Sequence, residues 1–152
     1  AIASGSRHLI GGQILDLEGE GSDIQLTPAQ LKYIHQSKTA ALLTTSIRLG
    51  GMSANATPQR LEALTGYGKS LGLAFQIIDD ILDVTQTSEK LGKSAGKDEA
   101  TEKSTYPALF GLGNSRKEAA RLTKRAHDAL KPFGKRGQRL HEILDYLLDR
   151  DY

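Results

Sequence analysis

Apolar residues recur at helical spacing through most of the chain, and threonine–proline pairs mark the start of two predicted helices. Thr27-Pro28 supplies an N-cap followed by proline at the first helical position. The pattern predicts a helix from there to Arg48, ended by Gly50-Gly51. Thr57-Pro58 repeats the signal and opens a long, mostly apolar helix.

The remaining segments also favour helices. Residues 9–17 are typical of the end of a buried helix that runs into a polar loop at 18–25, and Tyr106-Pro107 marks the start of a short structural helix. Two amphipathic helices are expected at about 115–131 and 138–149. Because no run of useful length alternates with the period of a strand, the chain is predicted to be all-α, with residues 1–152 forming part of a single domain.

The long helix carries three aspartates and a glutamine on one face. Gln76, Asp79, Asp80 and Asp83 stand at i, i+3, i+4 and i+7. Most of the surrounding residues are apolar, so the helix is expected to be buried, with its glycines at 66, 68 and 72 allowing close packing against a neighbour. The alternative is that the aspartates simply face solvent on an amphipathic helix.

Carboxylates on a buried helix need compensating cations. Asp79 and Asp83 lie one helical turn apart, roughly 6 Å, which is close enough to share a metal ion. An oxygen-only ligand set favours a hard cation such as Mg²⁺, which uses few carboxylates and completes its coordination with water and phosphate. The stripe therefore predicts a magnesium site.

Composition excludes several classes of protein. The 152 residues contain no cysteine, which excludes disulfides, iron–sulfur clusters and thiolate zinc sites. Twenty Lys and Arg against 18 Asp and Glu, dispersed along the chain, do not indicate binding to nucleic acid. No apolar run is long enough for a membrane span, and a soluble intracellular protein is expected. The chain begins without methionine, so it is expected to be a processed or truncated piece of something longer.

Lysines near glycine or threonine supply weaker signals. The segment 92–98 contains two lysines, Lys93 being the first, and two glycines. This composition suits a phosphate, but alone it more often marks a solvated loop, and it gains weight here only because it follows the acidic helix. Lys38 and Thr39 interrupt an apolar helical register; the lysine could extend to solvent or point into a cavity beside the aspartates. His35 has no second histidine spaced with it and is expected to be a packing or surface residue.

Taken together, these residues resemble the second half of a trans-isoprenyl diphosphate synthase of the farnesyl/geranylgeranyl type. The resemblance covers almost the whole chain, and its most specific part is the Phe-Gln-x-x-Asp-Asp-x-x-Asp pattern. The matching blocks, in the family's order, are Gly12-Gln13-Ile14-Leu15-Asp16-Leu17, Lys38-Thr39-Ala40-Ala41-Leu42, Phe75–Asp83, Leu91-Gly92-Lys93 with Gly96-Lys97-Asp98, and Lys103–Leu109.

The resemblance implies the C-terminal helices of the isoprenoid synthase bundle and a role for each matched residue. The aspartates Asp79, Asp80 and Asp83 would bind Mg²⁺ that bridges to diphosphate. Lys38 and Lys93 would contact the allylic diphosphate, while Thr39 and Gln76 would line the reaction centre near the developing cation. The implied reaction condenses an allylic diphosphate with isopentenyl diphosphate by ionisation, condensation and elimination.

The family's first aspartate-rich motif and its isopentenyl diphosphate site belong upstream and are absent from these 152 residues. The chain alone is therefore expected to be inactive and to expose apolar faces that upstream helices would cover. The resemblance implies a homodimer for the full-length protein, in the cytoplasm or, as a second choice, the plastid stroma. The alternatives are a non-catalytic regulatory subunit of a heteromeric prenyl synthase, which would tend to lose its aspartates, and a terpene cyclase.

Overall fold

The computed structural model describes residues 1–19, 26–91 and 104–148, with side chains omitted for 86–91. Every regular element in these ranges is helical, as predicted. The elements are η1 (Ile2–Ser4), α1 (Leu9–Gly19), α2 (Pro28–Ile34), η2 (His35–Ala40), α3 (Ala41–Ser53), α4 (Pro58–Leu91), α5 (Tyr106–Phe110), α6 (Leu112–Ala129), η3 (Lys131–Gly137) and α7 (Gln138–Leu148).

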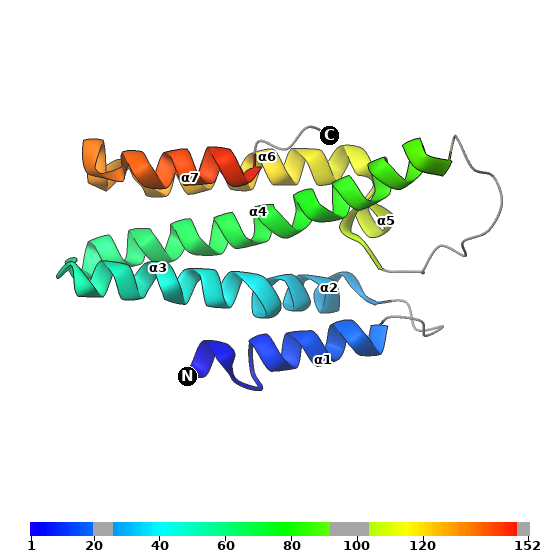
Figure 1. Cartoon of the computed structure of the whole chain (residues 1–152), viewed down its shortest axis with the longest axis horizontal. Helices are drawn as coiled ribbons and strands as arrows, with labels where there is room; N and C mark the ends of the chain where they lie inside the picture. The colour runs from blue at the N-terminus through cyan, green and yellow to red at the C-terminus, as the bar shows by residue number, and fades with distance from the viewer. Residues whose placement is uncertain (20–25, 92–103, 149–152) are drawn as a thin grey trace.

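The long helix α4 lies in the middle of the molecule (Figure 1). On one side of it, α2, η2 and α3 follow one another in a continuous rod, and α1 packs beyond them against η2. On the other side, α6 and α7 form an antiparallel pair joined by η3. The chain is thus arranged in layers, with α4 shared between them.

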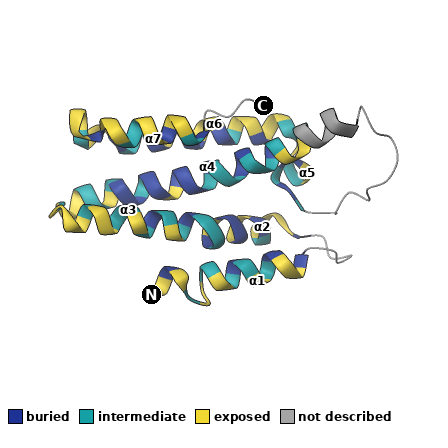
Figure 2. Ribbon diagram, in the orientation of Figure 1, coloured by how far each residue is buried: buried dark blue, intermediate teal, exposed yellow. Residues whose placement is uncertain are grey.

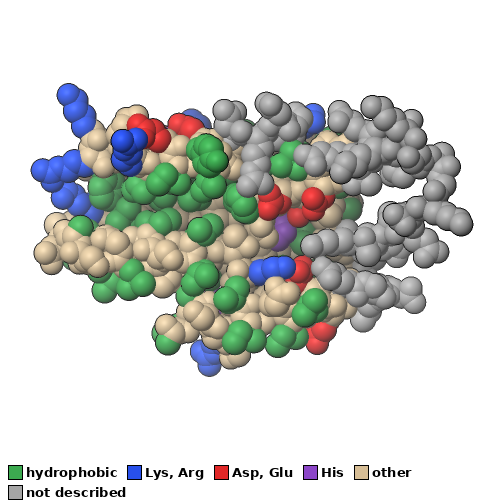
Figure 3. Space-filling view, viewed as in Figure 1, with side chains coloured by type: hydrophobic (Ala, Val, Ile, Leu, Met, Phe, Trp, Pro, Cys, Tyr) green, Lys and Arg blue, Asp and Glu red, His purple; other side chains and the backbone are tan. Residues whose placement is uncertain are grey.

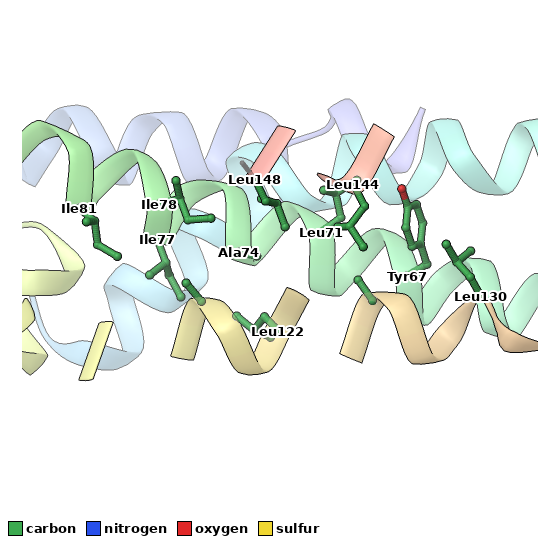
Figure 4. Packing of buried hydrophobic residues seen from close by; sticks show 12 residues of the cluster. Tyr67, Leu71, Ala74, Ile77, Ile78, Ile81, Leu122, Leu130, Leu144 and Leu148 are labelled. Carbon is green, nitrogen blue, oxygen red and sulfur yellow. The ribbon is translucent and has the colours of Figure 1, made fainter. Parts of the chain in front are cut away.

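The hydrophobic core lies between α4 and the α6–α7 pair. Tyr67, Leu71, Ala74, Ile78 and Ile81 recur every three or four residues along α4 and are buried there (Figures 2 and 4). The Tyr67 hydroxyl donates a hydrogen bond to the backbone oxygen of Leu140 at 2.8 Å. Burial, with a smaller contribution from the charge of Asp145, raises the pKa of Tyr67 to about 12.

Glycines bring the opposite side of α4 close to the rod. A Cβ at Gly72 would lie 2.5 Å from Ala40 Cα, and one at Gly68 would lie 2.8 Å from Thr44 Cα. The expected close packing is therefore confirmed at these two positions. It is wrong for Gly66, where an added Cβ would meet only Ala129 Cβ, at an ordinary 3.8 Å.

The predicted helix starts are confirmed. Thr27 forms a capping box with Gln30, each side chain taking the other residue's backbone N–H. Thr57 Oγ1 accepts the N–H of Arg60 at 3.4 Å, and Thr105 Oγ1 accepts the N–H of Ala108 at 3.3 Å. Tyr106 begins the expected short helix, α5.

The helix expected over residues 28–48 differs from the prediction in two ways. His35–Ala40 forms a π-helix, which interrupts the α-helical hydrogen bonding without ending the rod. The rod then continues past Gly50-Gly51 to Ser53 and turns at Asn55, whose φ is +53°. Glycine inside a helix costs only about 1 kcal/mol relative to alanine, so the pair was a weak stop signal.

Apolar side chains remain exposed on α1 and α3, as the sequence led us to expect. Ile10, Ile14 and Leu17 on α1 are 50%, 51% and 56% exposed, and Leu42 and Leu49 on α3 are 42% and 57% exposed. Figure 3 shows hydrophobic side chains distributed over one face of the molecule. Within the described ranges, no helix has the length and apolarity that a membrane crossing needs.

Candidate functional site

Charged side chains gather where α1, η2 and α4 meet, and Figure 3 shows acidic, basic and histidine side chains together on one face. The acidic stripe is carried by the second half of α4. Asp83 is exposed, whereas Asp79 and Asp80 are half-buried. The stripe is therefore neither fully buried nor a purely solvated face, because it borders the packed interface with η2.

Asp80 is held by two neighbouring elements. Its Oδ2 accepts the backbone N–H of Tyr106 at 2.7 Å, which caps the first turn of α5 from a residue 26 positions away. His35 Nε2, on the first residue of the π-helix, lies 3.4 Å from the same oxygen. His35 is 3% exposed, so of the two predicted roles, packing or surface, it has the packing one, with a polar contact that the sequence did not indicate.

Lys38 is paired with a residue to which the sequence assigned no role. Its Nζ donates to Asp16 Oδ2 at 2.5 Å, joining η2 to α1. Gly12, one turn before Asp16, makes this possible: a Cβ there would lie 2.7 Å from the backbone nitrogen of Lys38. Asp16 is 9% exposed, whereas the Lys38 side chain keeps 30% of its surface accessible. The lysine therefore neither extends freely into solvent nor is fully enclosed.

The other predicted residues lie beside this cluster. Thr39 is half-buried on the π-helix, next to Ala40, which packs directly on Gly72 of α4. Gln76 is half-buried one helical turn after Gly72 and one turn before Asp80. The π-helix that carries Lys38 and Thr39 therefore lies along α4, with Ala40 at Gly72 and His35 at Asp80.

Lys93 and the rest of the polar loop at 92–98 lie outside the described residues. Among the side chains that are described, no three His, Asp or Glu residues are grouped so that they could hold a metal ion by themselves. A cation at the stripe would thus take part of its coordination from other oxygens, as Mg²⁺ commonly does with water and phosphate.

Tyr106 completes the aromatic side of the cluster. Its ring centroid is 6.3 Å from that of His35, with the planes 21° apart, and 4.4 Å from that of Phe110. Burial raises the pKa of the Tyr106 hydroxyl; the charge of Glu118 acts in the same direction and that of Arg121 opposes it. From the sequence, Tyr106 is predicted only to begin a short helix, because nothing local indicates a contact with α4.

Fold and site together define an all-helical protein with an aspartate-rich helix and a lysine on the adjacent π-helix. The family model of the polyprenyl synthetases matches residues 1–146, and the chain belongs to this family. It is 43% identical, over 155 aligned positions, to the farnesyl diphosphate synthase of Escherichia coli strain K12; the match covers 99% of this chain and 51% of that enzyme.

Solved structures agree with the family. An FPP/GFPP synthase from Zymomonas mobilis superposes with a TM-score of 0.79 at 30% identity, covering 96% of this chain and 47% of that one. A geranyltransferase from Helicobacter pylori, complexed with magnesium and isoprenyl diphosphate, superposes with a TM-score of 0.68 at 29% identity, covering 97% and 49%. The chain thus spans about half the length of the proteins it matches.

Proposed function

We propose that the chain is the C-terminal half of a magnesium-dependent prenyl diphosphate synthase, which joins an allylic diphosphate to isopentenyl diphosphate. The observation that carries the proposal is that the π-helix bearing Lys38 and Thr39 packs along the half of α4 that carries the acidic stripe, through His35 at Asp80 and Ala40 at Gly72. Support comes from the family membership and from relatives named as farnesyl and geranylgeranyl diphosphate synthases.

The donors of the stripe fit magnesium. Asp79, Asp80 and Asp83 offer carboxylate oxygens along one face of a helix whose polar side is partly open to solvent. The complex of the H. pylori relative with magnesium and isoprenyl diphosphate supports the same cation for this chain. When bound, Mg²⁺ would supply Lewis-acid stabilisation of the negative charge on a departing diphosphate.

The chain's own residues would bind the diphosphate and orient the allylic group. The ammonium of Lys38, held at the site by Asp16, would neutralise part of the growing negative charge. The hydroxyl of Thr39 and the amide oxygen of Gln76 would face the developing allylic cation. Lys93, outside the described residues, is proposed as a second ammonium for the allylic diphosphate.

The chain spans about half the length of the relatives that it matches, and this bears on its activity. We expect the 152-residue chain alone to be inactive. The resemblance assigns the first aspartate-rich motif and the isopentenyl diphosphate site to residues upstream of this chain. The complete protein is proposed to be a homodimer in the cytoplasm. Retention of all three aspartates weighs against the alternative of a non-catalytic regulatory subunit.

The test is Asp79→Ala in a complete synthase that contains this chain. We expect kcat/KM for prenyl transfer to fall by roughly 100-fold or more, with unchanged helicity by circular dichroism, because a metal-binding carboxylate is lost. The matched control is Glu62→Ala, an exposed acid on the same helix, which should retain full activity. An unchanged rate of prenyl transfer in Asp79→Ala would show that Asp79 does not bind the metal. An inactive parent protein would favour the alternative of a non-catalytic regulatory subunit.

A further inference from the structure

A pair of histidines joins α6 to α7, the two helices packed against each other on one side of α4 (Figure 1). His127 Nδ1 lies 2.7 Å from His141 Nδ1, and His127 Nε2 lies 2.9 Å from Asp145 Oδ1. We propose that these three residues form a pH-sensitive clasp, which holds α7 against α6 until both imidazoles are protonated and then releases it.

The two rings face each other through their Nδ1 atoms. Their centroids are 5.0 Å apart and their planes differ by 12°. A distance of 2.7 Å between the nitrogens fits this centroid distance only if both nitrogens point at one another along the line between the rings. The contact is therefore a nearly linear hydrogen bond, in which one ring donates a proton and the other offers a lone pair.

Asp145 decides which ring donates. A carboxylate oxygen only accepts hydrogen bonds, so His127 carries a proton on Nε2. While His127 is neutral, its Nδ1 is the acceptor and His141 is the donor. If His127 takes up one proton, it donates to both Asp145 and His141, and the clasp stays closed. A second proton, on the lone pair of His141, leaves no acceptor between the rings and brings two positive charges into contact.

The charged groups around the clasp do not supply another acceptor. The neighbouring acids of α6 and α7 are held by basic side chains, in the pairs Lys124–Asp128, Lys131–Asp128 and Arg139–Glu142. From α4, Tyr67 approaches; burial, with a smaller contribution from the charge of Asp145, raises its pKa to about 12, so it stays neutral where imidazoles titrate. Asp145 itself is 61% exposed and already bonded to His127.

The clasp adds to a narrow attachment of α7. Leu144 and Leu148 are buried in the core, whereas Ile143 and Tyr146 on the same helix are 48% and 82% exposed. After release the two rings are independent and each binds its own proton, so the released form holds one proton more than the closed clasp. A fall in pH therefore favours release and a rise favours closure. The His127 side chain is 34% exposed, so protons reach it without opening of the core.

The first test is hydrogen exchange of the Leu144 and Leu148 amides, followed by NMR on the 152-residue protein. Protection factors, corrected for the intrinsic effect of pH on exchange, should fall about tenfold or more from about pH 7.5 to about pH 5. The Ile77 amide of α4 serves as the internal reference and should change less than about threefold. Unchanged protection at Leu144, or an equal fall at Ile77, would overturn the assignment of a local clasp.

Glutamine variants test whether these histidines cause the response. His141→Gln and His127→Gln each keep a side chain that can hydrogen-bond but does not titrate. In either variant the fall in Leu144 protection should shrink to less than about threefold. His8→Gln, in the turn before α1, is the matched control and should keep the full fall. A tenfold fall that persists in His141→Gln would show that the response arises elsewhere.

The ring nitrogens give a second measurement, which needs no variant. Long-range ¹H–¹⁵N NMR at about pH 8, where both rings are neutral, should place the proton of His141 on Nδ1 and that of His127 on Nε2. If both rings carried their protons on Nε2, there would be no proton between the two Nδ1 atoms, and the clasp would not exist.

Discussion

On the side of α4 that faces α6 and α7, large apolar side chains fill the interface, whereas on the side that faces η2 and α3 glycines bring the backbones together. Ile77 and Leu71 are nearly inaccessible on the first side. On the second, Gly68 and Gly72 leave no room for a Cβ. One helix therefore uses two kinds of packing.

The difference has a chemical consequence. At the edge of the glycine-packed interface of α4, Asp80 meets His35 of η2. Gly12 plays the same part between α1 and η2, where Lys38 pairs with Asp16. The apolar side supplies the stability that holds α4 in place, and the glycine side positions the groups proposed to bind substrate.

Removing a large side chain from the apolar side should have the largest effect on stability. Ile77→Ala is expected to lower the free energy of unfolding by about 2–5 kcal/mol, because the buried methyl groups are lost and a cavity remains. Chemical denaturation followed by circular dichroism measures this. Leu42→Ala, at a 42% exposed leucine on the rod, is the control and should change stability by less than about 1 kcal/mol. Similar losses in both variants would contradict the contrast between the two sides.

Adding a methyl group on the glycine side should come next. Gly72→Ala places a Cβ 2.5 Å from Ala40 Cα, and we expect a loss of about 1–3 kcal/mol as the helices separate. Gly113→Ala in α6 meets nothing within 4 Å and should be neutral or stabilise by up to about 1 kcal/mol. A stabilised Gly72→Ala protein would show that the two helices are not tightly packed at this point.

The ion pair between α1 and η2 should contribute less. Asp16→Asn is expected to destabilise by about 1–2 kcal/mol, since the pair is partly screened by the exposed portion of Lys38. A double-mutant cycle with Lys38→Met isolates the coupling energy. The exposed pair of Lys124 and Asp128 on α6 provides the comparison, with a coupling below about 0.5 kcal/mol. Equal coupling in the two pairs would contradict the burial argument.

The smallest effect at neutral pH is expected for the hydroxyl of Tyr67, whose removal in Tyr67→Phe should cost about 1 kcal/mol. Its pKa is raised from 10.0 to about 12 in the folded state, so the associated stability is fully present below pH 10 and is lost as pH rises toward 12. Urea denaturation between these pH values should show that the free energy of unfolding of the unmodified protein falls as the pH rises. In Tyr67→Phe this fall should be smaller. The control Tyr146→Phe, at an 82% exposed residue, should retain the full fall.

Periodicity and caps predicted most of the fold. The spacing of apolar residues on α4 and the threonines at 27 and 57 are local signals, because a helix face and a helix start depend on neighbours within a few residues. The acidic stripe was also visible in the sequence, since residues three or four apart share a face.

The partners of those residues could not be predicted from the sequence. Asp80 caps a helix 26 residues away, and Lys38 pairs with an aspartate 22 residues before it. The π-helix at His35–Ala40 likewise lacks a clear local pattern. The pairing of Lys38 with Asp16 depends on the close approach of α1 and η2 at Gly12, and the position of η2 on α4 depends on Gly72, so both are set across separate elements.

By itself, then, the sequence determined the helices, the carboxylate stripe on one of them and the resemblance to a family, because each follows from residues close together along the chain. The tertiary structure decided which carboxylate is committed to α5, which acid holds Lys38, and which glycines are required for packing. These depend on contacts between distant segments, and only the packed arrangement of α1, η2, α4 and α5 brings those segments within a few ångströms of each other.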